Sequence, residues 1–224
     1  MTDEDDALTA LGTLGDPVRR GLYRFVAAAP AEVGRDAAAE AVGISRALAA
    51  FHLDKLVEAG LLEVAFRRLS GRTGPGAGRP AKVYRRAGRE HAVSMPPRSY
   101  DTAAGLLAET VEQAGLDHAL QSAARARGAA QAPQGDPVAA LRARGYEPCP
   151  DGEDETVTRL RNCPFHALAQ EFPALVCGMN LALIEGLLAA GASASPESRG
   201  WSAEMSPGPD GCCVALRRIA PGDL

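Results

Sequence analysis

Apolar residues recur every three or four positions along the first thirty residues, which is the spacing of a helix with one apolar face. Asp16 and Pro17 interrupt this series with a capping residue and a residue favoured in the first helical turn. The pattern predicts a helix that breaks and restarts there and ends before Pro30. The apolar positions are Leu8, Leu11, Leu14, Val18, Leu22 and Val26.

Two shorter helical patterns follow. "RDAAAEAVG" ends at Gly43, and "ISRALAAFHLDKLVEAG" begins after the capping residue Ser45 and stops at Gly60. Two short helices joined by a tight glycine turn form a helix-turn-helix.

The next segments change from helix to strand. "LLEVAFRRLS" and "AKVYRRA" have the composition of strands, and they flank "GRTGPGAGRP", which is rich in Gly, Pro and Arg. This arrangement predicts a β-hairpin with a long basic tip. Three helical segments followed by a basic hairpin are the layout of a winged helix-turn-helix DNA-binding domain, which we expect over residues 1–90.

Three motifs in this region, "LGDPVRRGLYRFV", "FHLDKLVEAGLLE" and "GRPAKVYRR", resemble the ArsR-like winged-helix transcriptional regulators. Within them the chain is most similar to the branch of SufR-type repressors of iron–sulfur cluster biogenesis. The resemblance covers about the first ninety residues and extends more loosely to the cysteines of the second half. It implies a DNA-binding repressor whose C-terminal domain carries cysteine ligands for an iron–sulfur cluster.

The second half of the chain has a different organisation. Residues 99–130 are helical with apolar residues toward one side, and such a helix usually packs against a second copy or the next domain. We expect a linking and dimerisation helix there. "QAPQGDP" at 131–137 predicts a domain boundary. Residues 137–224 combine helices with short strands, which predicts an α+β sensor domain with helices on a small antiparallel sheet.

Charge is distributed unevenly along the chain. The net charge is −4, but between Phe66 and Arg98 nine basic residues stand against one acid, Glu90. A basic segment of this kind favours a polyanion as its partner. Together with the helix-turn-helix, it predicts binding to double-stranded DNA.

The second helix of a helix-turn-helix lies in the major groove. Its spacing buries Ala49, Leu53 and Leu56 and places Ser45, Arg46, Phe51, His52 and Lys55 nearer the outer surface. We expect Arg46 to bond guanine and Lys55 to meet phosphate. Phe51 could pack on a thymine methyl or serve the core or a dimer contact.

The hairpin supplies the second set of DNA contacts. Arg72 and Arg79 flank its glycine-rich tip, and we expect them to enter the minor groove. Arg67, Lys82 and Arg85 are then placed to contact phosphates.

Five cysteines in a chain without a recognisable secretory signal leave metal binding, redox sensing or plain packing. Thirteen residues separate Cys149 from Cys163 and Cys163 from Cys177, and thirty-four more precede Cys212. This is not a zinc-finger spacing, and free cysteine often packs as a small apolar residue. From the residues alone, ligands and core thiols therefore remain equal alternatives.

The context of two cysteines favours ligands. We expect Cys163 to open a helix, where the dipole lowers a thiol's pKa, and His166 to lie on the same side. Cys212 and Cys213 are adjacent in a predicted strand, so only one of them can easily join a given site, and Cys212 shares its face with apolar residues. The expected ligands are thus Cys149, Cys163, Cys177 and Cys212. The resemblance to SufR-type repressors implies that they hold an iron–sulfur cluster, and zinc is the alternative.

These observations predict a cytoplasmic, homodimeric regulator, a repressor, that binds a palindromic operator and senses iron–sulfur or metal status. An alternative is a regulator that binds a small organic ligand and has structural cysteines or zinc. A third is a nucleoid-type DNA protein without a sensor. No catalytic constellation or nucleotide-binding glycine motif accompanies Cys163 and His166, so we do not expect an enzyme. The most apolar segment carries Asn180 and Glu185, so no membrane role is expected.

Overall fold

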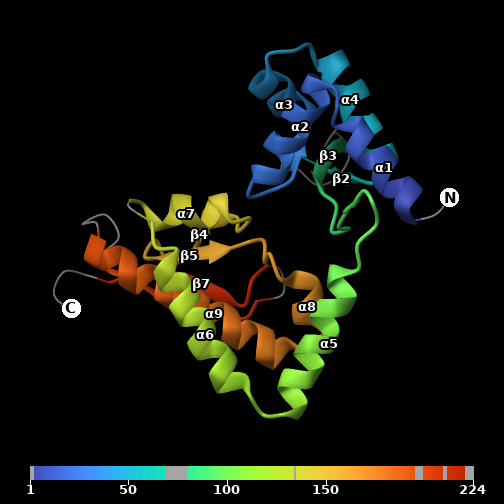
Figure 1. Cartoon of the computed structure of the whole chain (residues 1–224). Coiled ribbons are helices and arrows are strands. Elements are labelled where there is room, and N and C mark those ends of the chain that lie inside the picture. Colours follow the sequence, from blue (N-terminus) through green and yellow to red (C-terminus); the bar gives the residue numbers. More distant parts are fainter. Residues whose placement is uncertain (1–2, 69–79, 134, 195–198, 209–210, 220–224) are drawn as a thin grey trace. The chain divides into compact units, whose positions relative to one another are not determined.

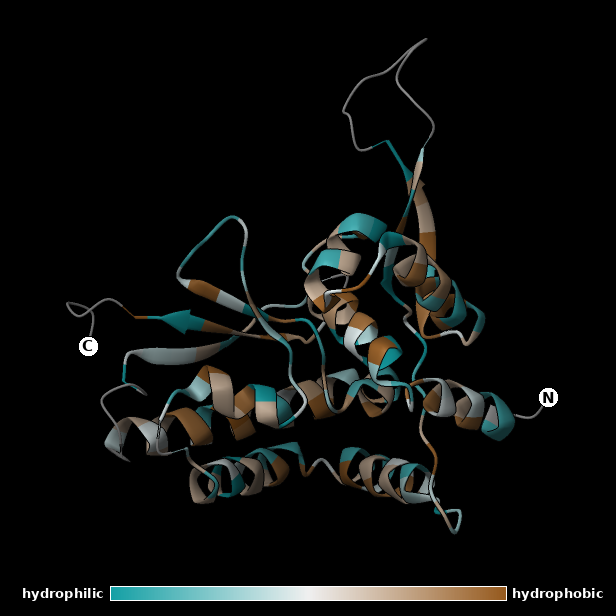
Figure 2. Cartoon of the chain, turned by 90° about the horizontal axis from the view of Figure 1, so that it is seen from above, coloured by the Kyte–Doolittle hydropathy of each residue, from teal (hydrophilic) through white to brown (hydrophobic). Residues whose placement is uncertain are grey.

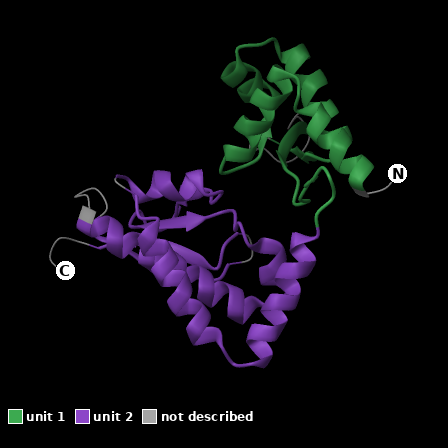
Figure 3. Ribbon diagram, in the orientation of Figure 1, with its two compact units in different colours: residues 1–98 green, residues 99–224 purple. Residues whose placement is uncertain are grey.

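The chain folds into two units, residues 1–98 and 99–224, in the computed structural model (Figure 3). The structure describes residues 3–68, 80–133, 135–194, 199–208 and 211–219. Helices combine with small antiparallel sheets in both units, so the predicted α+β class is confirmed.

The first unit places four helices on a three-stranded antiparallel sheet of order β1-β3-β2 (Figure 1). Its helices are α1 (Asp3–Thr13), α2 (Pro17–Ala28), α3 (Arg35–Val42) and α4 (Arg46–Glu58). Its strands are β1 (Val33–Gly34), β2 (Leu62–Arg67) and β3 (Ala81–Arg86). The two predicted hairpin strands pair in register from Leu62 opposite Arg86 to Arg67 opposite Ala81.

The predicted helix boundaries of this unit are confirmed by their caps. The Asp16 carboxylate accepts hydrogen bonds from the first backbone amides of α2, and the Ser45 hydroxyl accepts one from the amide of Leu48. Gly43 ends α3 and Gly60 follows α4, both in the left-handed conformation that glycine adopts without strain. The helix-turn-helix of α3 and α4 therefore follows directly from local sequence.

The core of the first unit lies between α2, α4 and the sheet. Ala49, Leu53 and Leu56 are fully buried, as their spacing predicts, and they pack with Leu22 and Tyr84. The inner face of α4 is thereby fixed, which decides which of its residues remain at the surface.

In its described residues, the second unit combines five helices with a four-stranded antiparallel sheet of order β4-β5-β7-β6 (Figure 1). Its helices are α5 (Tyr100–Gln113), α6 (Asp117–Ala130), α7 (Pro137–Ala143), α8 (His166–Glu171) and α9 (Pro173–Ala194). Its strands are β4 (Pro148–Pro150), β5 (Val157–Leu160), β6 (Trp201–Met205) and β7 (Val214–Arg218).

The expected linking helix over 99–130 is two helices. Gly115 takes a left-handed conformation (φ 65°) directly after α5, and the chain turns there into α6. α6 then packs along α9 instead of standing between two domains (Figure 1). The two units accordingly divide at residues 98 and 99, whereas the sequence pattern placed the boundary at 131–137.

α9 is the central helix of the second unit. By length and composition its segment Pro173–Ser193 could cross a membrane, and half of its most apolar window is buried within the unit. Asn180 is completely buried, and Glu185 forms an ion pair with Arg125 of α6. Elsewhere the helices carry hydrophilic and hydrophobic residues along their length (Figure 2). The contacts of α9 are those of a core helix.

Candidate nucleic-acid interface and thiol cluster

The first turn of α4 presents Arg46, the expected base-contacting residue. Its side chain is 68% exposed, and its Nε lies 2.6 Å from Oδ1 of Asp36 on α3. Farther along α4, Lys55 Nζ lies 2.6 Å from Glu58 Oε2, and Phe51 is 54% exposed. The outer face of α4 therefore holds an exposed aromatic ring and two cations, each already paired with a carboxylate.

His52 does not lie on that outer face. It is only 8% exposed, its ring meets Phe51 edge to face at 5.2 Å, and its Nδ1 has no hydrogen-bond partner. The expectation that His52 faces outward is wrong, because it lies three residues after Ala49 and four before Leu56 on the buried side of the helix. That spacing was readable from the sequence.

The basic residues of the hairpin are also paired with acids. Arg67 makes two hydrogen bonds to Glu32, at 2.7 and 3.0 Å, and Arg85 Nε donates to Glu63 at 2.9 Å. Arg72 and Arg79 lie outside the described residues. A phosphate bound by Arg67 or Arg85 would have to replace Glu32 or Glu63 as the partner of that arginine. The DNA contacts of these arginines remain predictions.

A network around Asp54 joins α4 to the sheet, and the sequence reasoning missed it. The Tyr84 hydroxyl donates to Asp54 Oδ1 at 2.7 Å, and Lys82 Nζ donates to both carboxylate oxygens at 3.1 and 3.2 Å. Arg35 of α3 donates to the Tyr84 oxygen at 3.0 Å and lies 3.4 Å from Asp54. The network fixes α3, α4 and β3 to one another.

Protonation states in this network follow from the hydrogen bonds. Burial acts to raise the pKa of Asp54, but hydrogen bonds from Tyr84 and Lys82 outweigh it, and the pKa is lowered. Burial raises the pKa of Tyr84 to about 12. Asp54 is therefore an anion and Tyr84 a neutral donor at neutral pH. Lys82 is held by this anion, so its expected role at a phosphate would compete with its role in the network.

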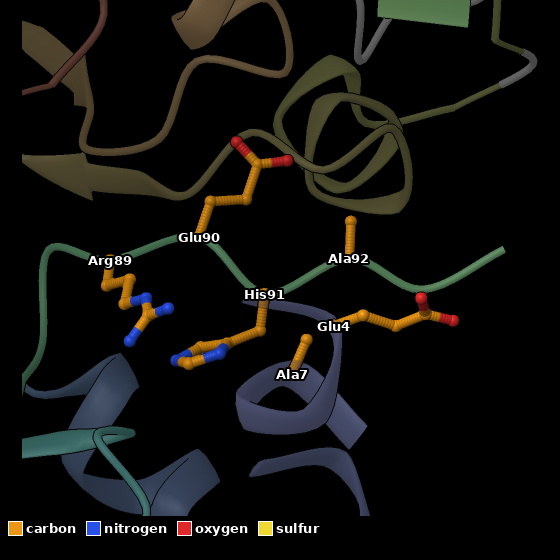
Figure 4. Close-up of a pocket in the computed structure, with 6 residues that line it drawn as sticks. All are labelled: Glu4, Ala7, Arg89, Glu90, His91 and Ala92. Carbon is orange, nitrogen blue, oxygen red and sulfur yellow. The ribbon is translucent and has the colours of Figure 1, made fainter. Parts of the chain in front are cut away.

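The described surface of the first unit includes two pockets of different character. One, of about 450 Å³, lies between the start of α3, the start of α4 and the base of the hairpin, and it contains three basic side chains. The other, of about 250 Å³, has mixed charge, and Glu90 points away from Arg89 and His91 (Figure 4). Only the first includes residues expected to bind DNA. Its lining is Gly34, Arg35, Asp36, Arg46, Phe66, Pro80, Ala81 and Lys82.

In the second unit, four of the five cysteines meet. Cys163 precedes α8, Cys177 lies on α9, and Cys212 and Cys213 directly precede β7. Cys212 raises the pKa of the Cys163 thiol, and Cys177 raises the pKa of the Cys213 thiol, so the members of each pair lie close enough to interact. Cys213 also interacts electrostatically with Cys163. Three distant segments thus bring two thiol pairs together.

The membership of this thiol cluster, Cys163, Cys177, Cys212 and Cys213, differs from the expected ligand set. Cys149 lies on the edge strand β4, where burial raises its pKa and its strongest charge interactions are with Arg161 and Asp151. Cys213, which the sequence pattern left out of the ligand set, interacts with Cys177 and Cys163. The predicted strand does not include Cys212 and Cys213, because the chain bends at Cys213 and β7 begins only at Val214, so the alternation of strand side chains does not apply to them.

Cys163 also differs from expectation in its chemistry. α8 begins at His166, three residues later, and the hydrogen bond with Cys212 together with burial raises the pKa of Cys163. The same hydrogen bond lowers the pKa of Cys212. His166 is exposed, and its Nε2 lies 3.0 Å from the side-chain amide of Gln170. The expected lowering of the Cys163 pKa by a helix start is therefore wrong.

Two of the four thiols are buried and two are partly exposed. Cys163 and Cys212 are 8% and 7% exposed and pack in an apolar core with residues of α7, α9 and β7, whereas Cys177 and Cys213 are partly buried. In the described part of the chain, no three cysteine, histidine, aspartate or glutamate side chains are arranged to hold one metal ion.

Comparison with known proteins supports the reading of the first unit. A family model described as a helix-turn-helix domain matches residues 14–65, from the end of the first helical segment into β2. Neither the curated proteins nor the solved structures contain a match to the chain. The matched domain supports a DNA-binding transcription regulator and points away from an enzyme.

Proposed function

We propose that the chain is a homodimeric cytoplasmic repressor whose first unit is a winged helix-turn-helix that binds a palindromic operator, and whose second unit senses an iron–sulfur cluster. The observation that carries the proposal is the gathering of four thiols from three segments in the core of a unit joined to a helix-turn-helix domain.

The donors suit the proposed cofactor in type and number, because four cysteine thiolates are the usual ligands of [2Fe–2S] and [4Fe–4S] clusters and also suit zinc. The residues that would hold the cluster are Cys163, Cys177, Cys212 and Cys213. In the described residues no three of these side chains surround one metal position, so binding would require the thiols to move toward a common centre. When bound, the cluster would supply a link between these segments that depends on iron supply and oxidation.

The packing of the second unit connects the thiols to exposed apolar side chains on α5. Cys163 lies three residues before α8, and α8 contacts α5. On α5, Leu106 and Leu107 are 61% and 68% exposed, and Tyr100 is 76% exposed. Apolar side chains this exposed suit a contact with a second copy. If Cys163 held the cluster, its ligation would fix α8, and α8 would set how the two α5 helices pair.

The pairing of α5 would in turn set the spacing of the two α4 helices. A dimeric helix-turn-helix protein needs half-sites about one helical turn of DNA apart, so a small change in spacing weakens operator binding. The cluster-bound and cluster-free proteins therefore differ in operator affinity, while each unit keeps its own fold.

The test is anaerobic purification followed by visible absorption spectroscopy and iron, sulfide and zinc analysis. We expect a coloured parent with matching iron and sulfide, and a Cys149→Ser control that retains both. Cys177→Ser and Cys213→Ser should lose the cluster. Stoichiometric zinc in a colourless parent would refute the iron–sulfur assignment. Cys163→Ser protein that responds to cluster loss as the parent does, in operator binding, would refute the coupling.

A further inference from the structure

The larger pocket of the first unit is not used by the proposed sensing mechanism. Its volume is about 450 Å³, which lies in the range of pockets that hold small organic molecules. Its walls come from the start of α3, the start of α4 and the base of the hairpin. Cationic and apolar side chains share these walls, so the pocket suits a ligand that has a charged end and an apolar body.

Three cations reach this pocket, and two of them are recessed. The side chains of Arg35 and Lys82 are 27% and 33% exposed, whereas that of Arg46, the first residue of α4, is mostly exposed. A phosphate of a DNA duplex joins two sugars, so it most easily reaches side chains that project from the protein. The recessed cations are therefore better placed for the end of a small anion than for the DNA backbone.

The charges at the pocket leave one positive charge in excess. Arg46 forms an ion pair with Asp36, and both recessed cations, Arg35 and Lys82, meet Asp54. Three cations against two carboxylates give a sum of +1 for these side chains. A guanidinium has five N–H donors, and in the described part of the chain the contacts use Nε of Arg46 and Nε and Nη2 of Arg35. A single carboxylate ligand thus matches the excess charge and the remaining donors.

An aromatic ring forms part of the apolar wall. Phe66 of β2 lies opposite Lys82 of β3 in the register, so the two side chains share one face of the sheet. That face is turned toward α4, because the hydroxyl of Tyr84, two residues after Lys82, hydrogen-bonds a carboxylate of α4. Phe66 is 63% exposed, which leaves its ring available to stack on the ring of a ligand. The apolar wall continues with Pro80 and Ala81.

We infer that this pocket binds a small aromatic carboxylic acid, and that the bound acid weakens operator binding. The carboxylate pairs with Arg46 and the recessed cations, and the ring lies on Phe66. Arg46 then has two competing partners, since the same side chain is expected to bond guanine. The competition rests on the proposed function, because it requires Arg46 at the DNA, whereas binding of the acid does not. By thermodynamic linkage, the operator lowers the affinity for the acid by the same factor.

The acid site is tested with benzoate as the probe, by ligand-observed NMR on the full chain. Benzamide is the neutral analogue, cyclohexanecarboxylate is the acid without an aromatic ring, and inorganic phosphate is the anion without an apolar body. We expect the parent to bind benzoate, and Arg46→Gln and Phe66→Ala to bind it about tenfold more weakly. Val64→Ala is the matched control, because Val64 lies on the same face of β2 as Phe66 but outside the pocket lining. Its affinity for benzoate should equal that of the parent.

The comparison of probes decides the ligand class. A parent that does not bind benzoate at millimolar concentration, or that binds benzamide equally well, overturns the acid site. Cyclohexanecarboxylate or phosphate bound as tightly as benzoate, with no loss in Phe66→Ala, overturns the aromatic assignment. If Phe66→Ala does not fold, Arg46→Gln decides alone: weaker benzoate binding supports the site, and unchanged binding overturns it.

The competition is measured as operator affinity with and without saturating benzoate at constant ionic strength, on an operator selected from random-sequence DNA. Benzoate should raise the Kd of the parent for the operator about tenfold. Phe66→Ala, which keeps Arg46, should bind the operator as the parent does and respond less to benzoate. An operator affinity that benzoate leaves unchanged in the parent overturns the competition. A parent that selects no DNA sequence overturns the proposed function, and benzoate binding then still decides the acid site.

Discussion

The contact between α6 and α9 depends on glycine. A Gly→Ala change in a helix usually stabilises it, but at this contact the change should be destabilising. A Cβ at Gly186 would lie 2.0 Å from the carbonyl oxygen of Arg125, far inside the 3.4 Å at which ordinary van der Waals contact begins. On the opposite helix, a Cβ at Gly128 would likewise lie 2.0 Å from the carbonyl oxygen of Leu183. Two backbones are therefore in direct contact, and neither has a side chain that can move away.

The magnitude follows from two opposing effects. Alanine in a helix interior is more favourable than glycine by about 1 kcal/mol. Overpacking a rigid contact costs about 1–3 kcal/mol and more when backbone must shift, as it must at Gly186. We expect Gly186→Ala to lower the free energy of unfolding by about 2 kcal/mol net, which corresponds to roughly 5–10 °C in Tm for a unit of this size.

Gly178→Ala is the matched control on the same helix pair. Its Cβ would meet only the end of the Gln121 side chain, at 2.8 Å, and that side chain can rotate away. Its Tm should stay level or rise slightly. Both variants are compared with the parent by thermal unfolding, followed by circular dichroism and calorimetry on metal-free protein. A Tm for Gly186→Ala equal to or above that of Gly178→Ala would show that the helix contact does not depend on this glycine.

Three further outcomes are expected. The pKa of Asp54 is lowered in the folded state, so its stabilising contribution is full above its ordinary pKa and is lost as pH falls through the folded value. Asp54→Asn should therefore lower the stability of the first unit at pH 7, and its stability should fall less steeply than that of the parent below about pH 4. Stability curves of parent and variant that run parallel in acid would contradict this. Arg46→Ala should weaken operator binding about 10–100-fold in a fluorescence titration, whereas Asp36→Asn, which frees Arg46 from its ion pair, should strengthen it. An Arg46→Ala protein that binds the operator as tightly as the parent would exclude Arg46 from base contact. Leu107→Glu should shift a dimer toward monomer in sedimentation, and an unchanged dimer would place the interface elsewhere.

Local sequence predicted most of the first unit because its boundaries depend on residues adjacent in the chain. Asp16, Ser45, Gly43 and Gly60 act within one helical turn, so their effect is visible without any tertiary contact. His52 was misplaced although its spacing from Ala49 was available, because the buried side of the helix was traced only through Ala49, Leu53 and Leu56. The Asp54 network escaped prediction because it joins α3, α4 and β3, which are separated in sequence.

The candidate metal site was likewise predicted only in part from the sequence. Cysteine count and the absence of a zinc-finger spacing were properties of the sequence, and they left ligands and core thiols as open alternatives. Three segments that the sheet and α9 bring together decide which thiols lie close to one another. Cys213 is at a bend in the chain, directly after Cys212. The hydrogen bond from Asn180 Nδ2 to Cys212 Sγ was equally invisible, since the two residues lie 32 positions apart.

By itself, the sequence determined the helix-turn-helix, the hairpin strands and the α+β class of the second half, because caps, turns and apolar periodicity are local properties of the chain. Only the tertiary structure decided that the segment over 99–130 breaks at Gly115 and packs on α9, that several cations expected to contact DNA are paired with acids, and that Cys213 and not Cys149 joins the thiol cluster. These features depend on contacts between distant segments, and such contacts are set by packing, which no local pattern records.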